Sequence, residues 1–426
     1  MELYNFQKEI LEETRGKNRV AYYYDMGLGK TYIGSEKIKE LMKVEPRFLL
    51  VCQKAKVKDW IKHFQDNYDF NIFDLTKDID SIIRFLASSN AIGIINYDLI
   101  FRRPLLKAQK LNLCLDESSL IQNTQAQRTK FILSLNYNDV ILLSGTPTAG
   151  KYENLYSQLK LLGYDKPKMY FYQCFVDYII SDHIGGMRLP RAILQIKGYK
   201  NIDKLKELLK HYNCYFKRSD EVLTLPKQNF ITVNCKPRRE YNEFVKKKII
   251  EIQDNEGKNI VLEGDHTFRK MMALRYLCGY LSREKLERLK SLLESTEDRV
   301  IVFYQFENDL KEIKEICKSL NKPISFVNGK DRSLLNYENE SNSVTIVQYQ
   351  AGSMGLNLQK ANKIIYFTPT LSSDLFEQSK KRIHRIGQEQ PCFYYLLKSG
   401  IEYHIYKTLE LRENYTRELF IKDYGE

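Results

Sequence analysis

The sequence predicts an α/β protein of two units, each a parallel sheet flanked by helices, with a small helical insertion between them. Three observations lead to this fold class. The chain has 426 residues, which is long for one compact domain and short for three. Short apolar runs rich in β-branched and aromatic residues alternate with longer charged segments of helical periodicity, a pattern typical of strands joined by crossover helices. This alternation is interrupted once, near the middle of the chain.

The first half contains one set of candidate strands, and the second half contains another. Those of the first half are residues 20–24, 48–52, 91–95, 111–115 and 140–143. Those of the second half are residues 300–304, 324–327, 344–349, 363–367 and 392–397. Their continuous apolar character is typical of parallel strands that are buried on both faces, so we expect one doubly wound sheet in each half.

The interruption lies at about residues 203–270, where lysine and glutamate are frequent and the periodicity is helical. Leu225 and Pro226 break the pattern there, which predicts a hinge followed by helices. We therefore divide the chain into an N-terminal unit at 1–228, a hinge and helical insertion at 229–290, and a C-terminal unit at 291–426.

Composition limits the classes of protein that fit. Hydrophobic residues make up 43% and charged residues 28% of the chain, which is typical of a globular protein. The formal net charge of +13 favours polyanionic partners such as nucleic acid or an acidic membrane surface, although a basic surface without a partner fits equally well. None of the eight cysteines forms a Cys-x-x-Cys pair, which argues against a zinc site and predicts reduced thiols.

The N-terminus lacks a basic segment followed by an apolar one, and no apolar stretch is long enough to cross a bilayer. We therefore expect an intracellular protein with no membrane contact.

The first chemical motif follows the first candidate strand and precedes a helix-prone segment. Residues 25–31 read Asp-Met-Gly-Leu-Gly-Lys-Thr. Gly27 and Gly29 let the backbone wrap around an anion, Lys30 can reach terminal phosphates, and the Thr31 hydroxyl can ligate Mg²⁺. The strict eight-residue phosphate-loop pattern lacks its first glycine, so a glycine-rich turn without ligand also fits, but the place between strand and helix favours a nucleotide.

Two adjacent acids, Asp116 and Glu117, follow the fourth candidate strand, at the edge where open α/β sheets bind ligands. In a nucleotide site Asp116 would hold Mg²⁺, and Glu117 would orient and deprotonate the attacking water. Such a pair alone is more often solvated charge; the upstream loop of Lys30 favours the catalytic interpretation. A small hydroxylated turn at residues 144–147 follows the next strand and could sense the γ-phosphate.

In the second half, Arg382 and Arg385 lie three residues apart in a basic segment and are expected to share a helical face. A permanently charged, planar guanidinium suits the charge that develops on a transferring phosphoryl group. A basic solvated helix is the alternative.

Together these motifs resemble those of the Swi/Snf-type ATPases of helicase superfamily two, over nearly the whole chain and in the expected order. The matching segments are residues 6–7, 25–31, 51–64, 116–123, 144–147, 216–226, 300–306, 351–358 and 382–388. The segments around Gly355 and from Arg382 to Arg385 are the most specific of these.

The resemblance implies two RecA-like lobes that bind ATP and Mg²⁺ between them, with Lys30 on one side and Arg382 and Arg385 on the other. It also implies that Phe6 and Gln7 recognise adenine. The residues it assigns to cofactor binding are Phe6, Gln7, Gly27, Gly29, Lys30, Thr31 and Gly355, and those to nucleic-acid backbone contacts are Lys54, Asn96, Tyr97 and Ser353.

Some positions depart from the family pattern. Tyr24 and Asp25 replace an acid pair, Ser119 stands where a histidine that couples hydrolysis to motion is common, and Gln122 replaces a basic residue. These departures bear on the strength of coupling between ATP hydrolysis and motion.

We expect an ATP-dependent translocase on double-stranded DNA, a minimal motor of the bacterial or phage kind. It would act as a monomer in the cytoplasm of a bacterium or a phage-infected host. Two alternatives remain: a helicase that separates strands of DNA or RNA, including a restriction-system motor subunit, and an ATP-dependent DNA clamp or adaptor that hydrolyses weakly.

Overall fold

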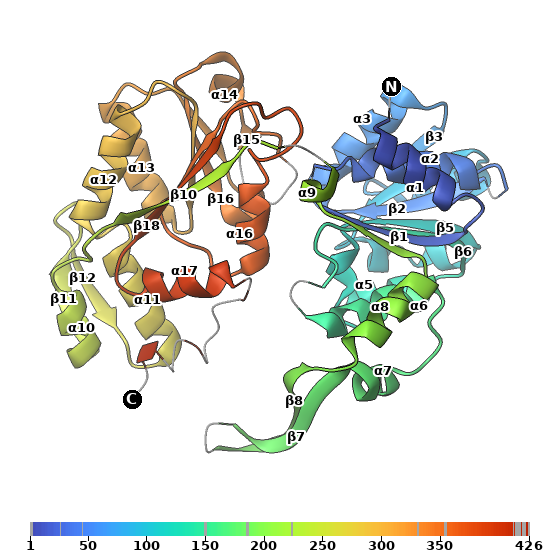
Figure 1. Ribbon diagram of the computed structural model, residues 1–426, viewed down its shortest axis with the longest axis horizontal. Coiled ribbons are helices and arrows are strands. Elements are labelled where there is room, and N and C mark those ends of the chain that lie inside the picture. The colour runs from blue at the N-terminus through green and yellow to red at the C-terminus, as the bar shows by residue number, and fades with distance from the viewer. Residues whose placement is uncertain are drawn as a thin grey trace. The chain divides into compact units, whose positions relative to one another are not determined.

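The computed structural model divides into two compact units, Met1–Leu223 and Thr224–Glu426. It describes residues 3–25, 27–44, 46–148, 151–184, 187–222, 225–329, 332–352, 356–411, 413, 419 and 423–424, and at 181–184, 187–193, 220 and 351–352 it describes the backbone alone. Each unit is built on one seven-stranded sheet (Figure 1).

The sheet of the first unit has the strand order β3-β4-β2-β5-β6-β1-β9, and all its pairings are parallel. Its strands are β1 (Arg19–Tyr24), β2 (Arg47–Cys52), β3 (Asn71–Asp74), β4 (Ala91–Asn96), β5 (Leu111–Asp116), β6 (Tyr137–Leu143) and β9 (Cys214–Lys217). The helices are α1 (Asn5–Glu13), α2 (Lys30–Leu41), α3 (Val57–Asn67), α4 (Ile79–Ala87), α5 (Gln127–Leu133), α6 (Tyr156–Leu162), α7 (Lys168–Phe175), α8 (Ile202–His211) and α9 (Ser219–Val222).

Both faces of this sheet are covered, as the apolar runs predicted. Along β1, Ala21 and Tyr23 belong to one hydrophobic core, whereas Val20, Tyr22 and Tyr24 belong to a second core on the opposite face. This alternation follows from the two-residue period of a strand.

An antiparallel hairpin, β7 (Val176–Ile184) and β8 (Met187–Tyr199), lies outside the sheet and extends away from α7 (Figure 1). Ile179 and Ile180 on its first strand are exposed. The sequence analysis did not predict this hairpin.

The sheet of the second unit has the order β10-β18-β17-β13-β16-β14-β15 and is parallel except at β14–β15. Its strands are β10 (Gln228–Asn234), β13 (Val300–Tyr304), β14 (Ile324–Val327), β15 (Arg332–Ser333), β16 (Val344–Gln348), β17 (Lys363–Tyr366) and β18 (Cys392–Lys398). The helices are α10 (Tyr241–Lys247), α11 (Thr267–Cys278), α12 (Arg283–Glu294), α13 (Glu307–Ser319), α14 (Leu335–Asn339), α15 (Tyr349–Gly352), α16 (Ser373–Lys380) and α17 (Glu402–Glu410).

All ten candidate strands occur, and each unit is the parallel α/β sheet with flanking helices that was expected of a RecA-like lobe. The segment 229–290 differs from its prediction as a hinge and helical insertion. It contains most of the edge strand β10 and the hairpin of β11 (Ile249–Gln253) and β12 (Asn259–Glu263), as well as helices, and it belongs to the second unit. The sequence analysis missed these strands because they lack a continuous apolar run. In β10, at a sheet edge, and β11, in a separate hairpin, exposed residues alternate with buried or half-buried ones.

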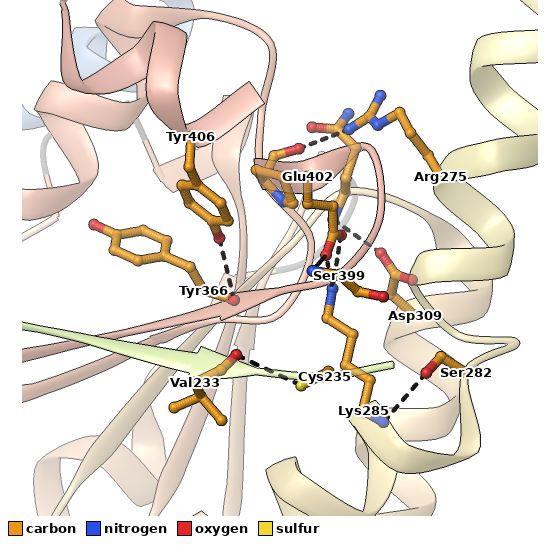
Figure 2. A network of polar contacts seen from close by, with 12 residues as sticks. Val233, Cys235, Arg275, Ser282, Lys285, Asp309, Tyr366, Ser399, Glu402 and Tyr406 are labelled. Carbon is orange, nitrogen blue, oxygen red and sulfur yellow. Dashed lines mark hydrogen bonds and ion pairs between the residues drawn. The ribbon is translucent and has the colours of Figure 1, made fainter. Parts of the chain in front are cut away.

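A buried polar network joins the helices of the second unit (Figure 2). Lys285 on α12 and Glu402 on α17 are both fully buried, and the ammonium lies 2.6 Å from the carboxylate. Glu402 also accepts the backbone N–H of Ser399 at 3.1 Å. Burial raises the pKa of Glu402, while the Lys285 ammonium lowers it. The network therefore links α12 to α17 through a buried ion pair, in which loss of one partner would leave the other charge without compensation by solvent.

Candidate nucleotide site

The carboxyl ends of the parallel strands of the first unit bring the predicted residues to one edge of the sheet. The loop 25–29 follows β1, Lys54 follows β2, Asn96 ends β4, Asp116 ends β5, and the turn 144–147 follows β6. Because all these strands run in one direction, the segments that follow them leave at the same edge.

The loop after β1 needs glycine for backbone reasons. Gly27 and Gly29 have φ angles of 89° and 70°, in the left-handed region that side chains disfavour. A Cβ at Gly29 would also overlap the Gln7 amide nitrogen. Helix α2 begins directly afterwards at Lys30, so its N-terminal amides are directed toward the loop.

The Lys30 ammonium is folded over the loop. It donates to the carbonyl oxygens of Tyr24 at 2.8 Å and Asp25 at 3.3 Å. The Asp25 carboxylate in turn accepts the backbone N–H and the hydroxyl of Ser219, each at 3.2 Å. Asp25, which replaces an acid of the expected motif, thus ties the loop to the start of α9.

Gln7 is held against the same loop from α1. Its amide nitrogen donates to the Leu28 carbonyl at 3.0 Å, its amide oxygen accepts the Tyr4 N–H at 3.0 Å, and its side chain is buried. Phe6 is partly buried, and its ring stacks on Tyr4 with a centroid distance of 5.9 Å. These contacts support the loop, and the recognition of adenine by both residues stays a prediction.

Asp116, the first acid of the pair, is held by side chains from α3 and from the segment after β4. The Trp60 indole N–H donates to the Asp116 carboxylate at 2.8 Å, and the Tyr97 hydroxyl donates to the Asp116 carbonyl at 2.9 Å. Glu117 has a φ of 56°, an unusual left-handed conformation for a side chain other than glycine or asparagine. The turn after β5 is therefore held in a specific, strained shape.

Tyr97 and Asn96 were expected to contact a nucleic-acid backbone, but their side chains lie inside the unit, 2% and 6% exposed. Burial, and next the nearby Asp116, raise the pKa of Tyr97 far above its ordinary value, so its hydroxyl stays protonated and donates internally. We assign Tyr97 to the support of the acidic turn. Lys54, by contrast, is exposed at the start of a 3-10 turn, where a phosphate contact is sterically open.

Sequence analysis did not identify Gln158 on α6, which links two motifs. Its amide oxygen accepts the Ser118 hydroxyl at 2.8 Å, and its amide nitrogen donates to the Pro147 carbonyl at 2.8 Å. The acidic turn is thereby connected to the turn 144–147, where the Ser144 hydroxyl oxygen accepts the Thr146 N–H at 3.2 Å. The only signal in the sequence was a polar residue inside an apolar helix.

The residues present suit ATP with Mg²⁺. Thr31 and Asp116 offer hydroxyl and carboxylate oxygens, the hard donors that Mg²⁺ prefers, and the two glycines with positive φ angles shape the loop before α2. Within the described residues, no three His, Cys, Asp or Glu side chains form a metal cluster. Mg²⁺ bound beside a nucleotide usually takes one or two protein ligands together with phosphate and water oxygens.

In the second unit, the arginines were expected on a helical face, but α16 ends at Lys380 and both lie in the turns that follow. Arg382 is almost fully buried and donates to the Leu356 carbonyl at 3.4 Å. Arg385 donates to the side-chain oxygen of Asn357, and burial lowers its pKa from the ordinary value. Both guanidinium groups thus bond to consecutive residues of one loop.

That loop belongs to the motif that contains Ser353 and Gly355, which were expected to contact nucleic acid and nucleotide. Both lie outside the described residues. Nearby, the Gln388 amide donates to the carbonyl oxygens of Gln359 at 3.1 Å and Ala361 at 2.8 Å. The arginine turn and the chain from 356 to 361 are therefore bonded to each other at several points.

Within the described residues, no helix combines the length and apolar character that crossing a bilayer requires.

Comparison with known proteins matches two family models to the chain, the SNF2-related domain at residues 23–282 and the helicase conserved C-terminal domain at residues 284–387. Similar curated proteins include the DNA repair and recombination protein RAD26 of Saccharomyces cerevisiae, 27% identical over 71% of this chain and 31% of that protein. A SWI/SNF-related matrix-associated actin-dependent regulator of chromatin subfamily A-like protein 1 of Xenopus tropicalis is 25% identical, over 88% of this chain and 40% of the relative.

A putative ATP-dependent helicase/translocase, YwqA of Bacillus subtilis, is 25% identical over 65% of this chain and 32% of its own length. The chain thus spans about a third to two fifths of the length of these relatives. Among solved structures, the Sulfolobus solfataricus SWI2/SNF2 ATPase core in complex with dsDNA aligns over 100% of this chain and 93% of that chain, with 19% identity and a TM-score of 0.45.

Proposed function

Because this chain belongs to the SNF2-related, Swi/Snf-type ATPases of helicase superfamily two, we propose that it is a DNA-stimulated ATPase that translocates on double-stranded DNA. The observation that carries the proposal is the joint placement of a glycine loop with Lys30 and of the acidic pair Asp116 and Glu117 at the carboxyl edge of one parallel sheet.

In this proposal, the loop and the N-terminus of α2 bind the phosphates of ATP through backbone N–H groups, and Lys30 exchanges its carbonyl partners for phosphate oxygens. Glu117 orients the attacking water and accepts its proton. Thr31 and Asp116 would hold Mg²⁺, which when bound offsets the charge of the phosphate oxygens. Phe6 and Gln7 would contact the adenine.

The second unit would contribute Arg382 and Arg385, whose charge suits the transferring phosphoryl group. Both are bonded to the loop that begins at Leu356. A guanidinium that turned toward phosphate would lose its bond to this loop. The state of the nucleotide would thereby affect the neighbouring motif of Ser353 and Gly355, where a DNA backbone contact is expected.

The formal net charge of +13 and the names of the relatives, which include a DNA repair and recombination protein and a putative helicase/translocase, support DNA as the polymer. Lys54 is the exposed candidate for a phosphate contact in the first unit. Such contacts attach to the backbone without selecting a sequence.

The proposal is tested by the steady-state ATPase rate without nucleic acid and with duplex DNA, single-stranded DNA or RNA. Strong stimulation by duplex alone, lost in Lys30→Ala and Glu117→Gln, is the expected result. Lys39→Ala is the matched control, because Lys39 lies exposed on the same helix α2 and should keep the wild-type rate. Stimulation mainly by single strands would favour a helicase, for which an unwinding assay on a forked duplex is decisive.

A clamp or adaptor that hydrolyses weakly is the second candidate function, and Ser119 and Gln122 are the residues that favour it. It predicts that ATP tightens DNA binding while DNA leaves the ATPase rate unchanged. A DNA-independent rate would therefore replace the translocase with this function.

A further inference from the structure

The chain's single tryptophan, Trp60, lies on α3, within the segment 51–64 that resembles the family but to which no role was assigned above. It is 2% exposed and its ring stacks on Phe64 with a centroid distance of 5.4 Å. A tryptophan in such a place could serve packing alone. Its indole N–H, however, donates to the Asp116 carboxylate at 2.8 Å, and this bond is the starting point of the inference.

The chemistry of this donor differs from that of a cation. An indole has one N–H, no acceptor and no charge. It can therefore orient a carboxylate and occupy one of its oxygens without neutralising it, whereas a lysine or arginine in the same place would compete with a metal ion. The second carboxylate oxygen of Asp116 keeps its full capacity as a ligand.

The same face of α3 is linked through Ser35 to the helix that carries Thr31, the other expected Mg²⁺ ligand. His63, three residues after Trp60 and on the same helical side, has its Nε2 3.0 Å from the Ser35 hydroxyl oxygen. The Ser35 hydroxyl donates to the Thr31 carbonyl at 2.8 Å, which uses its single hydrogen, so His63 Nε2 is the donor toward Ser35. One helical turn is thus bonded to the elements that carry Asp116 and Thr31.

We propose that Trp60 is a positioning residue for Mg²⁺: it orients the Asp116 carboxylate, while His63 on the same turn of α3 holds α2, which carries Thr31, through the Ser35 hydroxyl. This inference rests on the proposed function, because it needs Asp116 and Thr31 to hold the ion. Trp60 itself touches neither ATP nor Mg²⁺.

The hydrogen bond can be tested without catalysis. A single tryptophan gives a single indole ¹H–¹⁵N cross-peak, and a hydrogen-bonded proton resonates downfield. In the nucleotide-free full chain, Asp116→Ala should move this peak upfield. Asp66→Ala on the same helix, an exposed position, should leave it in place. An indole peak with the same chemical shift in Asp116→Ala as in the wild type would show that the bond is not formed and would overturn the inference.

The positioning role is tested by calorimetric titration with ADP over a series of Mg²⁺ concentrations. Trp60→Phe keeps an aromatic ring beside Phe64 but removes the N–H. In this variant, the Mg²⁺ concentration at which half of the increase in ADP affinity is reached should be about 10-fold higher, which is the usual cost of losing a supporting contact to a metal ligand. The affinity for ADP in the absence of Mg²⁺ should not change.

Phe64→Leu is the matched control, because it disturbs the same packing without touching the N–H. It should lower thermal stability and keep the wild-type Mg²⁺ requirement. A Trp60→Phe chain with the wild-type requirement would reduce Trp60 to a packing residue. Failure of the wild type to bind ADP at all would instead overturn the proposed function, whatever the indole peak shows about the bond.

Discussion

At the scale of single residues, the candidate site depends on backbone conformations that few side chains tolerate. Gly29 combines a positive φ with contact to Gln7, and Glu117 adopts a positive φ with a full side chain. The first lets the Gln7 amide approach the phosphate loop, and the second sets the direction of the acidic turn. Strain of this kind persists where surrounding contacts hold it, here the bonds from Trp60 and Tyr97 to Asp116.

A pair of glycine substitutions separates backbone strain from loss of the phosphate loop. Gly16 has a φ of 74° and no atom within 4 Å of the place that a Cβ would take, whereas Gly29 has a φ of 70° and Gln7 in that place. Each change to alanine should cost roughly 1 kcal/mol in strain. Only Gly29→Ala should weaken ADP binding, by about 10-fold or more, since its Cβ displaces Gln7. Calorimetry of both variants measures this, and equal affinities would contradict the role of the loop.

At the scale of elements, two helices of the second unit are joined by a buried ion pair, whose charges are not stabilised by solvent. Lys285 of α12 and Glu402 of α17 are fully buried, and a buried pair that loses one partner typically costs about 3–5 kcal/mol. The Lys285 ammonium also lies 5.2 Å from the Phe367 ring centre.

Lys285→Met should destabilise the protein in a manner that depends on pH. Without the ammonium, burial raises the pKa of Glu402 well above its ordinary value. The contribution of this raised pKa to stability is full below the ordinary carboxyl pKa and is lost as pH rises through the folded value. The deficit against wild type should therefore be small at pH 5 and approach about 3–5 kcal/mol at pH 8, measured by urea unfolding.

The double variant Lys285→Met, Glu402→Leu is its control. Replacement of both charges by apolar groups removes the uncompensated carboxylate, so most of the lost stability should return and the pH dependence should vanish. A deficit that is the same at pH 5 and pH 8 in the single variant would contradict this account of the pair.

At the scale of the whole molecule, the chain consists of two units that each have their own cores on both faces of a sheet. Two units of this kind can unfold in separate steps. Trp60, the single tryptophan, lies in the first unit, so its fluorescence reports on that unit alone.

Lys285→Met should therefore shift only one of two unfolding transitions. The far-ultraviolet circular dichroism should develop an early step that belongs to the second unit, while the Trp60 fluorescence midpoint stays within about 0.2 M urea of wild type, since the free energy of the first unit is unaltered. Coincident shifts of both signals would show that the two units unfold together.

Net charge gives the whole molecule a second testable property. With a formal charge of +13, binding to duplex DNA should rest on phosphate contacts and counterion release. The affinity should fall by at least about 10-fold between 50 and 200 mM salt, as expected for several phosphate contacts, measured by fluorescence anisotropy of a labelled duplex. Two unrelated duplex sequences should give the same curve, and a salt-independent affinity would contradict the electrostatic mode.

The sequence by itself determined the fold class, because a buried parallel strand needs a continuous apolar run and such runs stand out, as at β1, β5, β13 and β16. It also placed Asp116 at a strand end and the glycines of the phosphate loop before a helix. It did not identify β3, β9 and β10, which are short or half-exposed, nor the hairpin of β7 and β8. Only weak local signals mark strands that pack on one side.

The tertiary structure alone decided which side chains meet. Trp60 and Asp116, or Ser118, Gln158 and Pro147, are far apart in the chain and are brought together by strand order, which no local pattern encodes. The same holds for Tyr97, whose position after a strand suggested an exposed contact but whose hydroxyl is buried. It also holds for Arg382 and Arg385, whose spacing predicted a shared helical face although the helix ends before them. Spacing records periodicity along one element, whereas burial and hydrogen-bond partners depend on neighbours that the fold supplies.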